Sequence, residues 1–194
     1  MKVILLNGSP KSKGCTYTAL KIIENELINE GIEVKFYEVG NKPVIGCTGC
    51  TACRKLGKCV HDDLVNEVSK EIESADGFIV GSPVHYAAAS GAATSFLDRL
   101  FYSTDKNQLR HKFGASIVSC RRGGASATFD QLNKYFTINE MPIVSSVYWN
   151  QIHGNTPEEV VKDLEGVRTM KVLARNMPYL IKCKEAAKNV PLPK

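Results

Sequence analysis

The chain has 194 residues, of which 43% are hydrophobic and 23% are charged, and its formal net charge is +5 at pH 7. These values fit one globular domain over residues 1–194 with a full-sized core, and they exclude a disordered chain. No apolar stretch approaches the ~18–20 residues of a membrane span, and the N-terminus lacks a signal-peptide pattern. We therefore expect a soluble, cytoplasmic protein with no membrane partner. We expect no nucleic-acid partner either, because no long basic stripe with interleaved aromatic residues occurs.

The first half of the chain predicts strands and helices in alternation. An apolar run at 3–6 predicts a buried strand, and helical spacing of apolar residues predicts a helix at 16–30. A second strand is expected at 33–37, followed by a long loop at 38–61. Asp62 or Asp63 is expected to cap the next helix.

The second half continues this alternation. Strands are expected at 77–81, 115–120 and 142–148, and helices at 92–101, at 128–136 and from about 156. Ser82-Pro83 is expected to end the third strand, and Pro178 to kink or end the last helix. Five strands alternating with five helices predict an α/β fold with a doubly wound parallel sheet and helices on both faces. In such sheets ligands bind at the carboxyl ends of the strands.

Two loops at those strand ends carry candidate ligand-binding residues. The loop from Asn7 to Thr16 is not a P-loop, because Gly8 and Gly14 are one residue too far apart and Cys15 stands where the lysine should. It offers hydroxyl groups, two lysines and a helix N-terminus, which suit a phosphate, although an ordinary capped turn is the alternative. The loop at 81–91 combines small residues with His85 and Tyr86, which suits a planar ring; packing against a helix is the alternative.

Four cysteines fall within thirteen residues, as Cys47-x2-Cys50-x2-Cys53-x5-Cys59. Without a secretory signal, this density favours metal or redox chemistry over disulfides. The first three cysteines have the spacing of the bacterial ferredoxin run, whereas structural zinc sites usually separate two cysteine pairs by a longer span. The spacing therefore favours an iron–sulfur cube, and a thiol-bearing loop without metal is the alternative. Cys120 and Cys183, which lie apart, are expected to be buried small apolar residues.

Four motifs occur at these strand ends and in the helix after the third strand. They are Gly-Ser-Pro-Lys at 8–11, Ser-Pro-Val-His-Tyr at 82–86, Ser-Phe-Leu-Asp-Arg at 95–99 and the loop at 119–124. Together they resemble the flavodoxin-like NAD(P)H-dependent FMN reductase superfamily. The resemblance implies strand order 2-1-3-4-5 and bound FMN. The candidate phosphate-binding residues are Ser9, Lys11, Ser12, Gly14, Cys15 and Thr16. Those expected to line the flavin ring are Pro83, Val84, His85, Tyr86, Ser119, Arg121, Gly123 and Gly124.

The cysteine-rich loop at 41–61 also resembles the iron–sulfur flavoprotein branch of that superfamily. This resemblance implies a [4Fe–4S] cluster on Cys47, Cys50, Cys53 and Cys59, and a homodimer or homotetramer in which neighbouring subunits cover the flavin. Arg121 is expected either to stabilise reduced anionic flavin or to be an ordinary solvent-exposed arginine.

The implied activity is FMN-dependent oxidation of NAD(P)H, with electrons passed to a flavin, a quinone, another small oxidant or a protein. No catalytic side chain is expected, because the cofactor supplies the chemistry. One alternative is an iron–sulfur flavoprotein that carries electrons without nicotinamide turnover. A zinc-binding module on an α/β scaffold is the second alternative.

Overall fold

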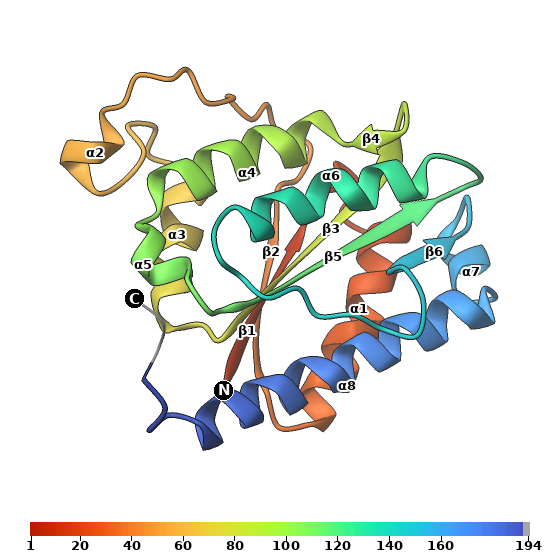
Figure 1. Ribbon diagram of the computed structural model, residues 1–194. Helices are drawn as coiled ribbons and strands as arrows, with labels where there is room; N and C mark the ends of the chain where they lie inside the picture. Colours follow the sequence, from red (N-terminus) through yellow and green to blue (C-terminus); the bar gives the residue numbers. More distant parts are fainter. Residues whose placement is uncertain (192–194) are drawn as a thin grey trace.

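The computed structural model describes residues 1–191 and shows a parallel sheet between two layers of helices (Figure 1). The order of its parallel strands is β2-β1-β3-β5-β6. Their bounds are β1 Lys2–Asn7, β2 Glu33–Glu38, β3 Gly77–His85, β5 Phe113–Cys120 and β6 Gln151–His153. A short strand, β4 (Ala88–Ala89), pairs antiparallel with the end of β3. With β4 set aside, this is the predicted order 2-1-3-4-5, and the flavodoxin-like fold is confirmed.

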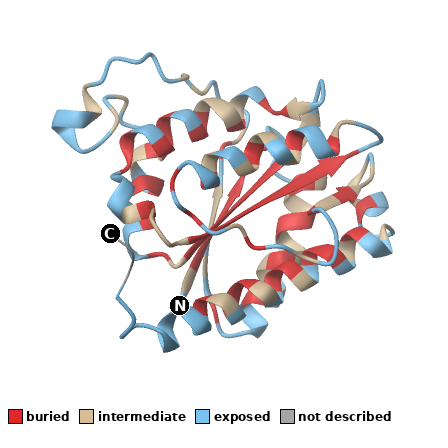
Figure 2. Ribbon diagram, viewed as in Figure 1, coloured by how far each residue is buried: buried red, intermediate tan, exposed pale blue. Residues whose placement is uncertain are grey.

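The helices form one layer on each face of the sheet (Figure 1). Helices α1 (Cys15–Asn29) and α8 (Leu164–Ala186) pack on one face, and α3 (Leu64–Ser74), α4 (Gly91–Ser103) and α6 (Ala125–Thr137) pack on the other. Each face has its own apolar core, and the central strands are buried between them (Figure 2). Three single-turn helices complete the set: α2 (Cys53–Leu56), α5 (Lys106–Leu109) and α7 (Pro157–Val160).

Two helix starts show how local chemistry fixes these elements. The Asp63 side chain caps α3 by accepting a hydrogen bond from the Val65 N–H at 3.1 Å, as the sequence predicted. Ser90 caps α4 by accepting from the Ala93 N–H at 3.1 Å. The Ser90 hydroxyl also donates to the Gly8 carbonyl at 2.6 Å, so the cap connects α4 to the loop after β1.

The prediction of a fifth parallel strand at 142–148 was wrong in position. That segment touches the sheet only through an isolated bridge between Gly114 and Ile143, and the strand forms at Gln151–His153. The reason is competition from α8: the Ser146 hydroxyl donates to the Thr169 carbonyl, and the Asn176 amide donates to the Ser145 carbonyl. These contacts hold the segment away from β5 until residue 151.

The structure also corrects the expectations that Ser82-Pro83 ends the third strand and that Pro178 ends the last helix. Strand β3 continues through Ser82-Pro83 to His85, because at Ser82 and Pro83 it pairs with β5 alone and a residue without an N–H is tolerated there. The last helix does not end at Pro178, which lies buried inside α8. The helix expected from about 156 is instead two helices, because α7 ends at Val160 and Asp163 caps α8 separately.

The segment at 40–62 lies outside the two layers and projects from the body of the molecule beside α4 (Figure 1). It contains one helical turn, α2, that the sequence did not predict. Among the described helices, none combines the length and apolar character needed to cross a membrane.

Candidate functional site

A cavity of about 160 Å³ lies at the carboxyl edge of the sheet, where the loops after β1, β3, β5 and β6 meet. This is the edge at which a doubly wound sheet binds its ligands. The lining residues are Ser9, Pro10, Lys11, Cys15, Thr16, Pro83, Val84, His85, Ser119, Arg121, Gly154 and Asn155. Four segments that lie far apart in the sequence therefore line one site.

A second cavity of about 490 Å³ adjoins the first and shares with it Pro10, Lys11, Cys15 and Asn155. Ser12, Lys13 and Gly14 line only this second cavity. Together the two cavities are lined by three cationic side chains, those of Lys11, Lys13 and Arg121, and no described lining residue is a carboxylate. The combined site is therefore electropositive, which favours an anionic ligand.

The loop after β1 satisfies its own hydrogen bonds and leaves the start of α1 open. The Asn7 side chain accepts from the Ser9 N–H at 3.1 Å, and the Ser9 hydroxyl accepts from the Lys11 N–H at 3.1 Å. The cap residue of α1, Gly14, offers no side chain, and the N–H groups of Thr16 and Tyr17 have no acceptor among the described hydrogen bonds. Open N–H groups at a helix N-terminus are suited to a phosphate.

The side chains at this helix start are polar but uncharged. The Thr16 and Ser119 hydroxyl groups lie 2.7 Å apart and are buried. The Cys15 thiol faces the Gly154 carbonyl at 3.6 Å, and burial raises the pKa of this thiol. Cys15 therefore stays protonated at neutral pH and adds no negative charge to the site.

The structure brings most of the predicted flavin-site residues together, with three exceptions. Tyr86, Gly123 and Gly124 do not line either cavity. Tyr86 is fully exposed at the tip of the β3–β4 hairpin, in a left-handed conformation. Gly124 packs closely against that hairpin, since a Cβ at this position would lie 2.8 Å from the Ala87 Cα atom.

Sequence reasoning missed Pro10, Gly154 and Asn155 of the first cavity, and Lys13, Thr156 and Pro157 of the second. Pro10 lies between predicted residues. Gly154 and Asn155 follow β6 directly, so the same strand-end rule would have found them had the last strand been placed at 151–153.

The four clustered cysteines gather around one small cavity. Cys47, Cys50, Cys53 and Cys59 all line it, together with Arg99 and Tyr102 from α4, and all four thiols are free. No three His, Cys, Asp or Glu side chains in the described part of the chain lie close enough to hold a single metal ion. The ligands of an iron–sulfur cluster need not lie that close together. Each cysteine of a cubane binds a different iron atom, so its sulfurs are farther apart than the ligands of a single metal ion.

An ion pair anchors this cysteine-bearing segment to the body of the protein. Arg99 of α4 is 1% exposed, and its two terminal nitrogens donate to the two Asp63 carboxylate oxygens at 2.7 and 2.8 Å. Burial raises the pKa of Asp63, but the hydrogen bonds from Arg99 and Val65 outweigh it and lower the pKa below its ordinary value. Asp63 is therefore ionised at neutral pH.

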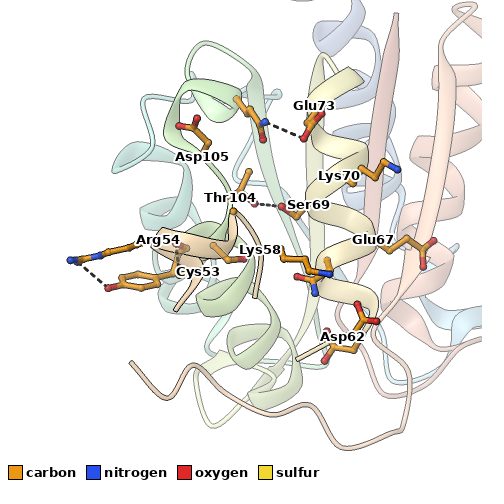
Figure 3. Close-up of a pocket in the computed structure, with 16 residues that line it drawn as sticks. Cys53, Arg54, Lys58, Asp62, Glu67, Ser69, Lys70, Glu73, Thr104 and Asp105 are labelled. Carbon is orange, nitrogen blue, oxygen red and sulfur yellow. Dashed lines mark hydrogen bonds between the residues drawn. The ribbon is translucent and has the colours of Figure 1, made fainter. Parts of the chain in front are cut away.

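A groove of about 900 Å³ runs along the outer side of the same segment, between α2, α3 and the end of α4 (Figure 3). Its acidic and basic side chains are mixed, so the groove has no single sign of charge. Of the four cysteines, Cys53 alone lines both this groove and the cysteine cavity. Elsewhere, Cys120 is buried as predicted, whereas the prediction that Cys183 is buried was wrong, since it is exposed near the end of α8.

The fold and the cavity at its strand ends define a flavodoxin-like α/β protein with an electropositive cavity at the carboxyl edge of the sheet. Its sequence is 32% identical to an iron–sulfur flavoprotein of Methanocaldococcus jannaschii over 189 residues, covering 94% of this chain and 98% of that one. A flavodoxin from the domain Archaea superposes with a TM-score of 0.64 at 15% identity, covering 94% of this chain and 99% of the other. RosB with a bound riboflavin-phosphate intermediate superposes with a TM-score of 0.76 at 14% identity, covering 96% and 81%.

The profile of the NADPH-dependent FMN reductase family matches residues 1–156. The chain belongs to this family, in its iron–sulfur flavoprotein branch, and is an FMN-dependent oxidoreductase.

Proposed function

We propose that this protein oxidises NAD(P)H through FMN bound at the carboxyl edge of the sheet and passes the electrons on through a [4Fe–4S] cluster held by the cysteine-bearing segment. The observation that carries the flavin assignment is the pair of adjoining cavities lined by three cations and no carboxylate. The observation that carries the cluster assignment is the meeting of four free thiols around one cavity.

The residues present fit FMN. The open N–H groups at the start of α1, with Lys11, Ser9 and Thr16, would hold the phosphate. Pro83, Val84 and His85 on one side and Ser119 and Arg121 on the other would border the ring. The similar structure of RosB with a riboflavin-phosphate intermediate supports a flavin phosphate on this fold.

The residues present also fit an iron–sulfur cluster better than a zinc ion. A mononuclear site needs its ligands around one atom, and the described side chains offer no such group. Four thiols around a shared cavity suit a cubane, which spreads its ligands over four irons. Related chains of this branch are named iron–sulfur flavoproteins, in agreement with this assignment.

Bound FMN would supply two-electron exchange with the nicotinamide, and a cluster would supply single-electron exchange. The chain's own residues would bind the FMN and set its reduction potential. The cations hold the phosphate, and Arg121 places positive charge beside the ring, where negative charge develops on reduction. Cys15, kept neutral by burial, avoids repulsion of the phosphate.

The first test is anaerobic purification followed by a visible spectrum and assays of iron, sulfide and zinc. Flavin bands with about four irons per chain are expected, the count for a cubane on four cysteines. Changing each clustered cysteine to serine should remove most of the iron, while Cys183→Ser, at an exposed thiol far along the chain, should leave it unchanged. Flavin without iron, or zinc in place of iron, would refute the cluster.

Nicotinamide turnover is tested separately, with NADH and NADPH compared under anaerobic conditions. We expect reduction of the bound flavin by at least one of them, and continued turnover when a quinone or free flavin is added. A holoprotein that shows no turnover with either nucleotide would instead be an electron carrier, reduced by another protein.

We further propose that a second copy of the chain covers the flavin, in a homodimer or homotetramer. The exposed aromatic side chains include Tyr86, fully exposed beside the cavity, and the tilted pair Tyr148 and Trp149, each about half-exposed. Exposed aromatic groups of this kind are typical of interfaces. Light scattering of the flavin-loaded protein tests this proposal, and a monomer at micromolar concentration would refute it.

A further inference from the structure

Arg99 is the largest fully buried side chain of the described chain, and it reaches from α4 into the cysteine-bearing segment. A guanidinium group has five N–H donors in a fixed planar arrangement. A buried one is costly unless all of them are used. The positions of these five hydrogen bonds therefore show what the residue is built to hold.

All five donors of Arg99 have acceptors. Besides the two bonds to Asp63, Nη1 donates to the Ile45 carbonyl and Nη2 to the His61 carbonyl, each at 3.3 Å. The remaining donor, Nε–H, points at the Cys59 sulfur, with 3.3 Å between nitrogen and sulfur. One side chain thus holds the segment before the first cysteine, the fourth cysteine itself and the residues that follow it.

Cys59 is fixed at its backbone as well as at its sulfur. The Asn66 side chain accepts from the Cys59 N–H at 2.9 Å and donates to the Cys59 carbonyl at 3.0 Å. The other three cysteines have no comparable contact. Cys53 faces the Tyr102 carbonyl at 3.8 Å, and the described contacts include no hydrogen bond from the sulfurs of Cys47 and Cys50. Among the four thiols, Cys59 alone receives a hydrogen bond from a cation.

We propose that Arg99 is a positioning residue for the iron–sulfur site: it fixes Cys59 as the fourth ligand and raises the reduction potential of the cluster through its Nε–H···Sγ hydrogen bond. This inference rests on the cluster proposed above. Hydrogen bonds to cysteine sulfur are one of the means by which proteins set cluster potentials. Reduction adds one electron, part of whose charge resides on the ligand sulfurs, and an N–H directed at sulfur stabilises that state.

Asp63 explains why this effect is local. Its carboxylate neutralises the guanidinium from the side opposite the sulfur, so the pair has no net charge while Nε–H still faces Cys59. A change that keeps the positive charge but loses the planar arrangement of donors should therefore abolish the effect. Lysine meets this requirement, because its donors share one nitrogen and cannot bond both the carboxylate and the sulfur.

The test compares Arg99→Lys with Arg54→Lys. Arg54 lies next to Cys53 on α2, but the only described hydrogen bond of its side chain goes to the exposed Tyr102 hydroxyl at 3.4 Å. Cluster and flavin potentials are measured together by redox titration monitored by electron paramagnetic resonance and absorbance. In Arg99→Lys, the ratio of reduced to oxidised cluster at fixed potential should fall about tenfold, or about 59 mV for a one-electron couple. The flavin potential should not move in either variant, and Arg54→Lys should match the wild type.

An unchanged cluster potential in Arg99→Lys overturns the inference while leaving the proposed function intact. If Arg99→Lys loses its iron, its cluster potential cannot be measured, and the contact between Arg99 and the cluster is tested in the wild-type protein instead. With arginine labelled with ¹⁵N, pulsed paramagnetic resonance of the reduced cluster should show a nitrogen coupling that persists in Arg54→Lys, and its absence overturns the inference. A wild-type protein without iron overturns both this inference and the proposed cluster.

Discussion

The hydroxyl groups of Thr16 and Ser119 lie 2.7 Å apart, although 103 positions separate the two residues in the chain. Thr16 belongs to the first turn of α1, and Ser119 lies near the end of β5. Both are buried and both line the electropositive cavity. Their contact joins the loop that is suited to phosphate to the strand that borders the proposed ring site.

Replacing Thr16 with valine should weaken FMN binding about tenfold, or ~1.4 kcal/mol, because the shape is kept while a hydroxyl donor beside the phosphate is lost. Titration of the apoprotein with FMN, followed by fluorescence, measures the dissociation constant. Ser116→Ala is the matched control: Ser116 is also buried in β5, and its hydroxyl donates to Asn133 at 2.6 Å away from the cavity. Equal affinities in Thr16→Val and the wild type would refute a role for this hydroxyl.

Gly124 should tolerate no side chain. Its φ is +92°, a left-handed value that L-residues adopt at a cost, and a Cβ would lie 2.9 Å from the Val84 side chain and closer still to Ala87. Gly124→Ala should lower the free energy of unfolding by about 1–3 kcal/mol and reduce FMN affinity by shifting the hairpin at 84–87. Gly123→Ala, where a Cβ meets nothing within 4 Å, should behave like the wild type in urea unfolding and FMN titration.

Arg121 should tune the flavin, whereas its neighbour Arg122 should not. Both arginines are exposed, but only Arg121 lines the cavity. Removing the charge with Arg121→Gln should disfavour the reduced anionic flavin about tenfold, which is about 30 mV for a two-electron couple. Arg122→Gln serves as the control in the same spectroelectrochemical titration. A potential that moves equally in both variants would identify a general charge effect and contradict a specific role for Arg121.

The ion pair between Asp63 and Arg99 should make stability sensitive to acid. Because the pKa of Asp63 is lowered on folding, its stabilising contribution is complete above its unfolded pKa of ~3.9 and is lost as pH falls through the lowered value. At pH 7, Asp63→Asn should cost about 2 kcal/mol, less than the ~3–5 kcal/mol of a fully buried pair, because the Asp63 side chain is 42% exposed.

Urea unfolding of the apoprotein at several pH values measures this dependence. The difference between Asp63→Asn and the wild type should be constant above about pH 5 and should shrink below about pH 4. Asp62→Asn is the control, since Asp62 has no hydrogen bond or ion pair among the described contacts. It should change the free energy of unfolding by less than about 0.5 kcal/mol. A difference for Asp63→Asn that does not shrink at all as the pH falls below about 4 would contradict the assignment.

Much of the fold followed from local patterns. The apolar run at 3–6 and the helical spacing of apolar residues at 16–30 are patterns that depend only on residues close together in the sequence. Asp63 is recognisable as a helix cap for the same reason, because its side chain accepts from the N–H of Val65, two residues on. Local patterns failed where a distant partner decided the outcome. Residues 142–148 have the composition of a strand, but bonds from α8 hold them off the sheet.

The candidate site, like the fold, could be predicted from the sequence only in part. The sequence by itself determined which residues are chemically suited to their tasks: the cysteines by their spacing, and the loop after β1 by its hydroxyls, lysines and helix start. Only the tertiary structure decided that Gly154 and Asn155 complete the cavity and that Tyr86 points to solvent. It also decided that Arg99 donates both to Asp63 and to the cysteine-bearing segment. The physical reason is that periodicity, capping and ligand spacing act over a few residues. A hydrogen bond such as that between Arg99 and Cys59 depends on how α4 and a distant loop pack, which no local pattern encodes.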